Sequence, residues 1–152
     1  MRLEEALTKT WSAMIGMKLE KTTGPSNTLD GACVGCVSVS GGWRGDLVLS
    51  VSGSLARKVT GAMLGMPDEE LESEMVKDAV GEVANITAGN LAKAAEAPCE
   101  LSTPFVMFSR STVIGAGISP GASMNDTALL GRLCFECVGE PVVVALYAND
   151  GE

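Results

Sequence analysis

The chain has 152 residues, 46% of them hydrophobic and 20% charged, which is enough to form one domain with a substantial core. Its formal net charge of −8 provides none of the positive surface that nucleic acid or an anionic membrane attracts. The absence of histidine excludes Ser-His-Asp and Cys-His catalytic groups and histidine metal sites. We therefore expect a single domain, residues 1–152, that binds neither nucleic acid nor membrane.

The first third of the chain predicts a helix followed by a β-hairpin. Apolar side chains at spacings of three and four predict a helix over residues 4–16 that ends at Gly16. Two β-like runs, residues 33–40 and 43–52, flank Gly41-Gly42, which is typical of a hairpin turn.

The rest of the chain predicts two further helices and then short strands. Ser54 is the predicted cap of a helix that stops before Pro67, and a longer helix is predicted from Asp68 to about Ala97, closed by Pro98. Strands are predicted at residues 103–108, 111–116, 129–138 and 142–147. This order predicts an α+β fold, a mostly antiparallel sheet with long helices packed on one face.

Two features favour a cytoplasmic location. Glu4 and Glu5 come directly after the start, unlike the basic and then apolar plan of a signal peptide. The five cysteines are an odd number, which fits a reducing compartment better than a disulfide framework.

The longest predicted helix has an unusual polar side. On a helical wheel, residues 74–96 form an apolar stripe, and Asp78, Glu82, Asn85, Gly89 and Glu96 gather opposite it. Glu82 and Asn85 are three residues apart, so their side chains are neighbours. Gly81 and Gly89 flank the pair, and each weakens a helix by roughly 1 kcal/mol relative to alanine. Helix stability therefore does not explain this choice of residues.

Two interpretations of this polar side follow from the residues alone. It is either a solvated face with incidental polar groups, or a functional surface. In the second case the glycines provide a flat patch that admits the backbone of another protein, and the amide of Asn85 belongs to a site.

A family resemblance favours the functional interpretation. Residues 78–93 (DAVGEVANITAGNLAK) resemble the signature helix of the CheX-type chemotaxis phosphatases, relatives of CheC and FliY. That family carries Asp or Ser, then Glu four residues later, then Asn three residues further, and Asp78, Glu82 and Asn85 match these positions. Gly81, before the glutamate, and the Gly-Asn pair that begins at Gly89 match as well.

The resemblance extends beyond this helix. Residues 101–104 (LSTP) resemble the proline-bearing strand that follows in the family, and residues 14–17 resemble the end of its opening helix. The opening helix here has Glu4 and Glu5 but no asparagine at the matching offset. We therefore expect one site, without the second site found in CheC.

The resemblance implies a substrate, a partner and roles for these residues. The substrate would be the aspartyl phosphate of a CheY-like response-regulator receiver domain. The protein would need no cofactor of its own, because Mg²⁺ and a lysine would come from the receiver. Asn85 would orient the attacking water and Glu82 would pair with the receiver lysine, while Asp78, Gly81 and Gly89 would contact the partner. Relatives also imply a homodimer.

Two alternatives remain. A protein of the same fold could bind receivers, or sequester them, without hydrolysis. The second alternative is a zinc or redox protein, because residues 33–36 (CVGC) and 134–137 (CFEC) form two Cys-x-x-Cys pairs. Both pairs lie in predicted strands, where residues three apart point to opposite faces, so we interpret these cysteines as small core residues.

Overall fold

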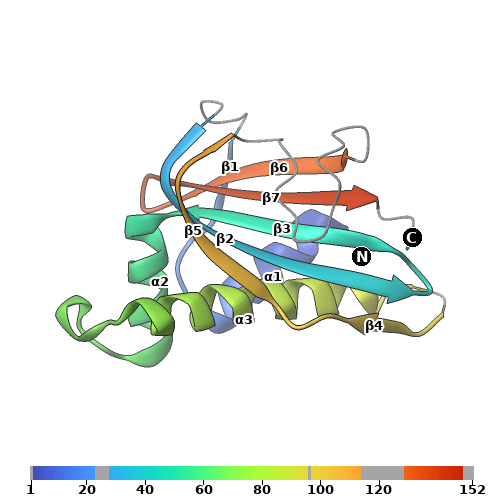
Figure 1. Ribbon diagram of the computed structural model, residues 1–152, viewed down its shortest axis with the longest axis horizontal. Helices are drawn as coiled ribbons and strands as arrows, with labels where there is room; N and C mark the ends of the chain where they lie inside the picture. Colours follow the sequence, from blue (N-terminus) through green and yellow to red (C-terminus); the bar gives the residue numbers. More distant parts are fainter. Residues whose placement is uncertain (1, 23–27, 96, 114–128, 149–152) are drawn as a thin grey trace.

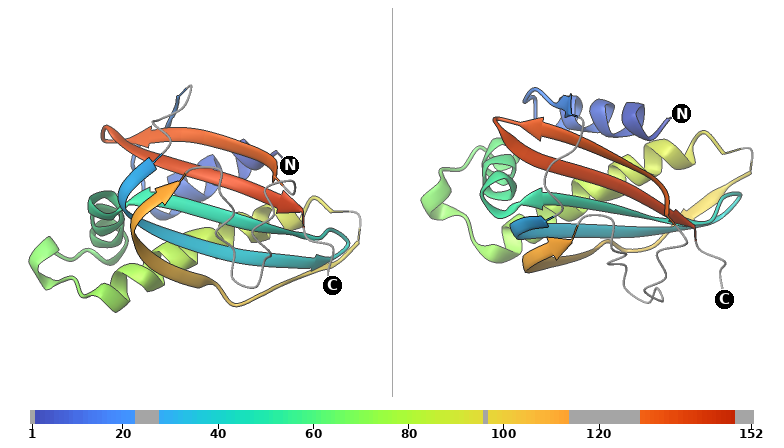
Figure 2. Two further views of the ribbon diagram at one scale, coloured as in Figure 1. Left: turned by 45° about the horizontal axis from the view of Figure 1, so that its top comes forward. Right: turned by 90° about the horizontal axis from the view of Figure 1, so that it is seen from above.

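The computed structural model describes residues 2–22, 28–95, 97–113 and 129–148. In these residues the helices pack on one side of a seven-stranded antiparallel sheet, as Figures 1 and 2 show. The helices are α1 (Leu3–Met14), α2 (Gly53–Leu64) and α3 (Ser73–Ala92). The strands are β1 (Glu20–Thr22), β2 (Thr28–Gly41), β3 (Gly45–Ser52), β4 (Cys99–Leu101), β5 (Phe105–Val113), β6 (Leu129–Cys137) and β7 (Glu140–Ala148). The predicted α+β class is confirmed.

The sheet is built around the predicted hairpin. Its order is β1-β6-β7-β3-β2-β4, and β5 also pairs with β2, so β5 and β4 share one edge and β1 lies at the other. The hairpin of β2 and β3 is confirmed, with β2 extended further toward the N-terminus than expected. The predicted strands at residues 103–108 and 111–116 are parts of one strand, β5; residues 114–116 lie outside the described part of the chain.

The helices are shorter than predicted. Asp68–Glu70 form a separate 3-10 turn and Leu71 is extended and buried, so α3 begins at Ser73. Arg57 of α2 holds this turn, because its Nε donates to Asp68 Oδ1 at 2.9 Å. The predicted N-terminal cap of α2 was wrong by two residues. Ser52, not Ser54, accepts a hydrogen bond from the backbone N–H of Leu55.

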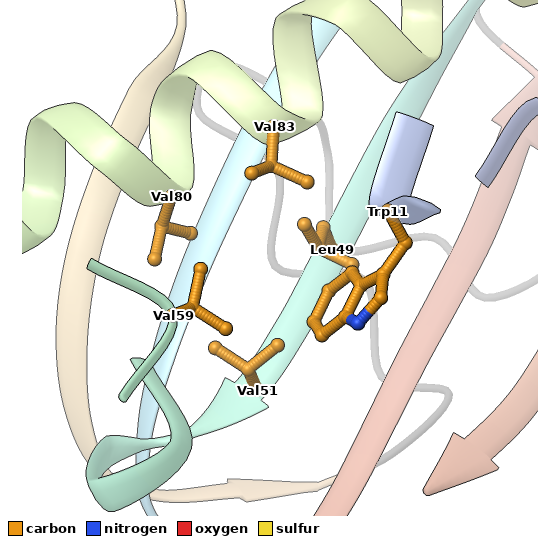
Figure 3. Close-up of a pocket in the computed structure, with 6 residues that line it drawn as sticks. All are labelled: Trp11, Leu49, Val51, Val59, Val80 and Val83. Atoms are coloured by element: carbon orange, nitrogen blue, oxygen red, sulfur yellow. The ribbon is translucent and has the colours of Figure 1, made fainter. Parts of the chain in front are cut away.

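The core lies between the helices and the sheet. Gly35 of β2 allows α3 to lie close to the sheet, since an added Cβ would be 3.4 Å from Ala84 Cβ and from Val80 Cγ1. Where the three helices meet β3, a cavity of about 10 Å³ remains (Figure 3). Its lining is entirely apolar: Trp11, Leu49, Val51, Val59, Val80 and Val83. Such a space is too small and too apolar to hold water, so the centre of the core is nearly close-packed.

None of the described helices is long and apolar enough to cross a membrane.

Candidate functional site

The polar side of the long helix is exposed, as the helical period predicts. Asp78 and Glu82 are exposed and Asn85 is half-buried, all on the side of α3 that faces away from Val80 and the sheet. We call these three residues the α3 ridge. Within the described part of the chain, neither Glu82 nor Asn85 makes a hydrogen bond or an ion pair. One carboxylate and one amide, neighbours on a helix, therefore remain available to another molecule.

The remainder of α3 is firmly held. Half of its buried positions carry small residues, which are Ala79, Gly81, Ala84 and Ala88. On one flank Asn90 Nδ2 donates to Thr10 Oγ1 of α1 at 3.0 Å, and Thr10 is buried. The ridge is thus presented by a helix packed against β2, α1, α2 and β5, which fixes the position of the Asn85 backbone relative to the rest of the protein.

Gly81 packs closely against the chain's own residues. It is buried, and an added Cβ would be 3.1 Å from Val106 Cγ2 and 3.3 Å from Pro104 Cβ. Pro104, just before β5, and Val106 of β5 therefore occupy the space beside this glycine, which gives it a packing role within the chain. A contact between Gly81 and a partner stays a prediction. Gly89 is half-buried, with Leu101 Cδ1 at an ordinary 3.7 Å from an added Cβ. Its contact with a partner stays a prediction.

Residues 101–108 run beside the ridge in the direction opposite to α3. Leu101 lies near Gly89, Val106 lies near Gly81, and Phe108 lies near Lys77. The Lys77 ammonium is 5.6 Å from the centre of the Phe108 ring and 3.9 Å from Glu74 Oε1. Sequence reasoning missed Lys77 and Phe108, because only the sheet order places β5 beside α3.

The cysteines lie away from the ridge and do not converge. Cys33 packs in the core on the helix side of β2, whereas Cys36 belongs to the cluster on the opposite face. The second pair is on β6, separated from β2 by β7 and β3. Burial raises the pKa of the Cys33 thiol to about 12, although Lys77 opposes this rise. Among the described residues no three metal-ligating side chains come together, and the interpretation as core cysteines fits this placement.

The fold is that of the CheX and CheC-like chemotaxis proteins. A solved chemotaxis protein CheX from Desulfovibrio desulfuricans superimposes with a TM-score of 0.75 at 21% identity, over 97% of this chain and 96% of that one. The CheX of the CheX-CheY-BeF3-Mg²⁺ complex from Borrelia burgdorferi gives a TM-score of 0.67 at 18% identity, over 97% and 96% of the two chains.

The sequence places the chain within this class. Residues 33–115 match the family model described as chemotaxis phosphatase CheX, and this range includes Glu82 and Asn85. Because the match covers more than half of the chain, the protein belongs to the CheX family. A curated relative, the CheY-P phosphatase CheX of Thermotoga maritima, is 34% identical over 79 residues. That alignment spans 49% of this chain and 51% of the relative, about half of each.

Proposed function

We propose that this protein hydrolyses the aspartyl phosphate of a CheY-like receiver domain, with the α3 ridge inserted beside the phosphoryl group. The observation that carries the proposal is the Glu82–Asn85 pair on a well-packed helix, with Glu82 exposed, Asn85 half-buried and neither bonded to the described chain. Family membership supports it, as does the name of the Thermotoga maritima relative, a CheY-P phosphatase. The Borrelia burgdorferi relative was solved with CheY, BeF3 and Mg²⁺.

Asn85 is assigned to the attacking water. An acyl phosphate is already activated, so its hydrolysis depends mainly on positioning and on neutralising charge. The amide oxygen of asparagine accepts a hydrogen bond from water, while its NH₂ donates to a phosphoryl oxygen. Held in this way, the water lies in line with the phosphorus and the leaving carboxylate, in the manner of the glutamine of GTPases.

Glu82 and Asp78 are assigned to the receiver. We expect Glu82 to form an ion pair with a receiver lysine beside the phosphoryl group, which fixes the docked geometry. Asp78 lies one helical turn earlier on the same side and extends the contact. Mg²⁺ is expected on the receiver, and the protein is expected to contribute no cofactor.

The proposal is tested by the decay of a receiver phosphorylated on aspartate, in the presence of Mg²⁺, with and without this protein. Catalysis predicts faster release of phosphate at protein concentrations far below that of the receiver. If the protein binds the phosphorylated receiver but leaves its lifetime unchanged or longer, it is instead a receiver-binding module of the same fold. An absence of both binding and acceleration, across the receivers encoded near this gene, would contradict the proposal.

We further expect a homodimer in the cytoplasm. Among the described residues β1 pairs only with residues 134–136 of β6, and the neighbouring Leu129 and Leu130 are exposed apolar residues on the same strand. Burying this apolar area against a second copy would stabilise a dimer. The five cysteines, all in the described residues, form no disulfide, which fits a reducing compartment. Light scattering during size-exclusion chromatography measures the oligomeric state.

A further inference from the structure

The α3 ridge is too narrow to account for a specific protein complex. A standard interface buries about 800 Å² on each partner, equivalent to a disc with a radius of roughly 16 Å. Three side chains in a row on one helix provide only part of such an area. A receiver centred on Glu82 and Asn85 must therefore also cover what lies beside α3.

The surface on the β5 side of the ridge carries an exposed aromatic ring. Phe108 is 44% exposed. The chain has only three phenylalanines. Its β2 partner Cys33 packs in the core on the helix side, so Phe108 lies on the same side of the sheet as α3. It contacts α3 at Lys77, which is five residues, or about 7.5 Å, along the helix from Glu82. Phe108 therefore lies inside the expected footprint.

The charges beside this ring differ from those of the ridge. Lys77, whose ammonium also lies 3.9 Å from Glu74 Oε1, places a positive charge over Phe108. The negative charges of Asp78 and Glu82 follow one and five residues later on α3. Consider a partner whose lysine meets Glu82, and whose apolar group and neighbouring acidic group meet Phe108 and Lys77. Such a partner would meet complementary charges in only one orientation. Charge patterns of this kind fix orientation and exclude wrong partners.

We infer that Phe108 and Lys77 form a specificity-determining contact for the receiver, covering an apolar side chain and an acidic group next to its phosphorylation pocket. This inference rests on the proposed function, because the receiver is the occupant. Phe108 touches no reacting atom in this arrangement. It therefore contributes equally to the ground state and the transition state, so its removal changes KM and receiver affinity but not kcat.

The same strand provides a matched control. Phe105 is 48% exposed, close to the value for Phe108. Its β2 partner is Cys36, which packs on the opposite face of the sheet, so Phe105 points away from α3. Phe105→Ala removes the same ring from the same strand at a similar exposure, without touching the proposed contact.

The test compares these variants against a receiver activated with beryllofluoride and Mg²⁺, and then against the phosphorylated receiver. We expect Phe108→Ala to raise Kd and KM at least tenfold while leaving kcat within twofold, as the loss of an aromatic anchor does at interfaces. Phe108→Leu should recover part of the affinity, Lys77→Gln should weaken binding by severalfold, and Phe105→Ala should match the wild type. Circular dichroism and Tm verify that each variant is folded.

Two results have distinct meanings. If the wild type binds and dephosphorylates the receiver but Phe108→Ala and Phe105→Ala give equal Kd values, the inference is overturned and the proposed function stands. If the wild type neither binds nor dephosphorylates any receiver, the proposed function fails and the inference fails with it.

Discussion

Two glutamates of this chain show opposite uses of the same side chain. Glu140, at the start of β7, accepts hydrogen bonds from Ser52 and Ser54 at the N-terminus of α2, and its Oε2 lies 2.9 Å from Lys58 Nζ. Glu82, on the α3 ridge, has no partner among the described residues. Glu140 joins the sheet to a helix, whereas Glu82 is left available to another protein. Substitutions at the two positions should therefore affect different properties.

The pKa of Glu140 reflects these contacts. Burial alone would raise it, but the hydrogen bonds from Ser52, Ser54 and Lys58, together with the Lys58 charge, hold the pKa at about 2. The carboxylate is thus ionised throughout the physiological range, and its role is structural.

The largest change in stability is expected at Glu140. Glu140→Ala leaves two serine hydroxyls and an ammonium without their acceptor and should lower the free energy of unfolding by about 2 kcal/mol. Urea denaturation measures this change. Glu100→Ala, at an exposed position on β4, is the control and should stay within about 0.5 kcal/mol of the wild type. Equal stabilities for the two variants would show that the Glu140 contacts contribute nothing.

The converse result is expected at Glu82. Glu82→Gln should lower kcat/KM for the phosphorylated receiver about tenfold, because the charge that pairs with the receiver lysine is lost. Its free energy of unfolding should not change, since no contact within the described chain is removed. Phosphate-release kinetics and urea denaturation on the same preparation measure both quantities. Full activity in Glu82→Gln would contradict the ion pair.

A fall in pH should destabilise the wild type more than a variant that lacks the Glu140 carboxylate. Because the folded-state pKa of Glu140 lies below its ordinary value of 4.5, the group stabilises the fold above about pH 4.5 and loses this effect as pH falls toward 2. Between pH 6 and pH 3 the wild type should lose about 1 kcal/mol more than Glu140→Gln, allowing for solvent screening. Denaturation curves at the two pH values measure the difference, and parallel losses would show that another group dominates.

The smallest effects are expected at the two glycines of α3. Gly89→Ala should stabilise the protein by about 0.5–1 kcal/mol, because alanine favours the helix and an added Cβ meets only an ordinary contact. Gly81→Ala should gain less or lose stability, because Val106 and Pro104 must move. Thermal unfolding compares the variants. If Gly89→Ala is more stable but less active, Gly89 contacts the receiver; unchanged activity would remove it from the interface.

The sequence predicted the elements whose apolar and polar side chains follow a local periodic pattern. The hairpin of β2 and β3 was predictable because its strands are long, apolar and joined by Gly41-Gly42. The exposed side of α3 was predictable because the helical period separates Val80 and Val83 from Glu82 and Asn85. The three-residue strands β1 and β4 were missed, since each is too short to show an alternating pattern.

The features that were not predicted depend on contacts between segments that are distant in the sequence. The acidic Asp68–Glu70 favours a helix start, yet Arg57 and the buried Leu71 hold it as a separate turn. The packing of Gly81 against Pro104 and Val106 was not predictable, because the sequence does not show that β5 lies beside α3. Phe108 gave no signal because its exposure depends on β5 lying at the sheet edge.

The central claim is that the Asn85 amide positions the water that attacks the receiver's phosphoaspartate. Its most direct test is the single-turnover rate of phosphate release from a phosphorylated receiver saturated with Asn85→Ala. The account predicts a rate lower by on the order of 100-fold than with the wild type, while binding to the beryllofluoride-activated receiver stays within a few fold. A wild-type rate at saturation would contradict the claim.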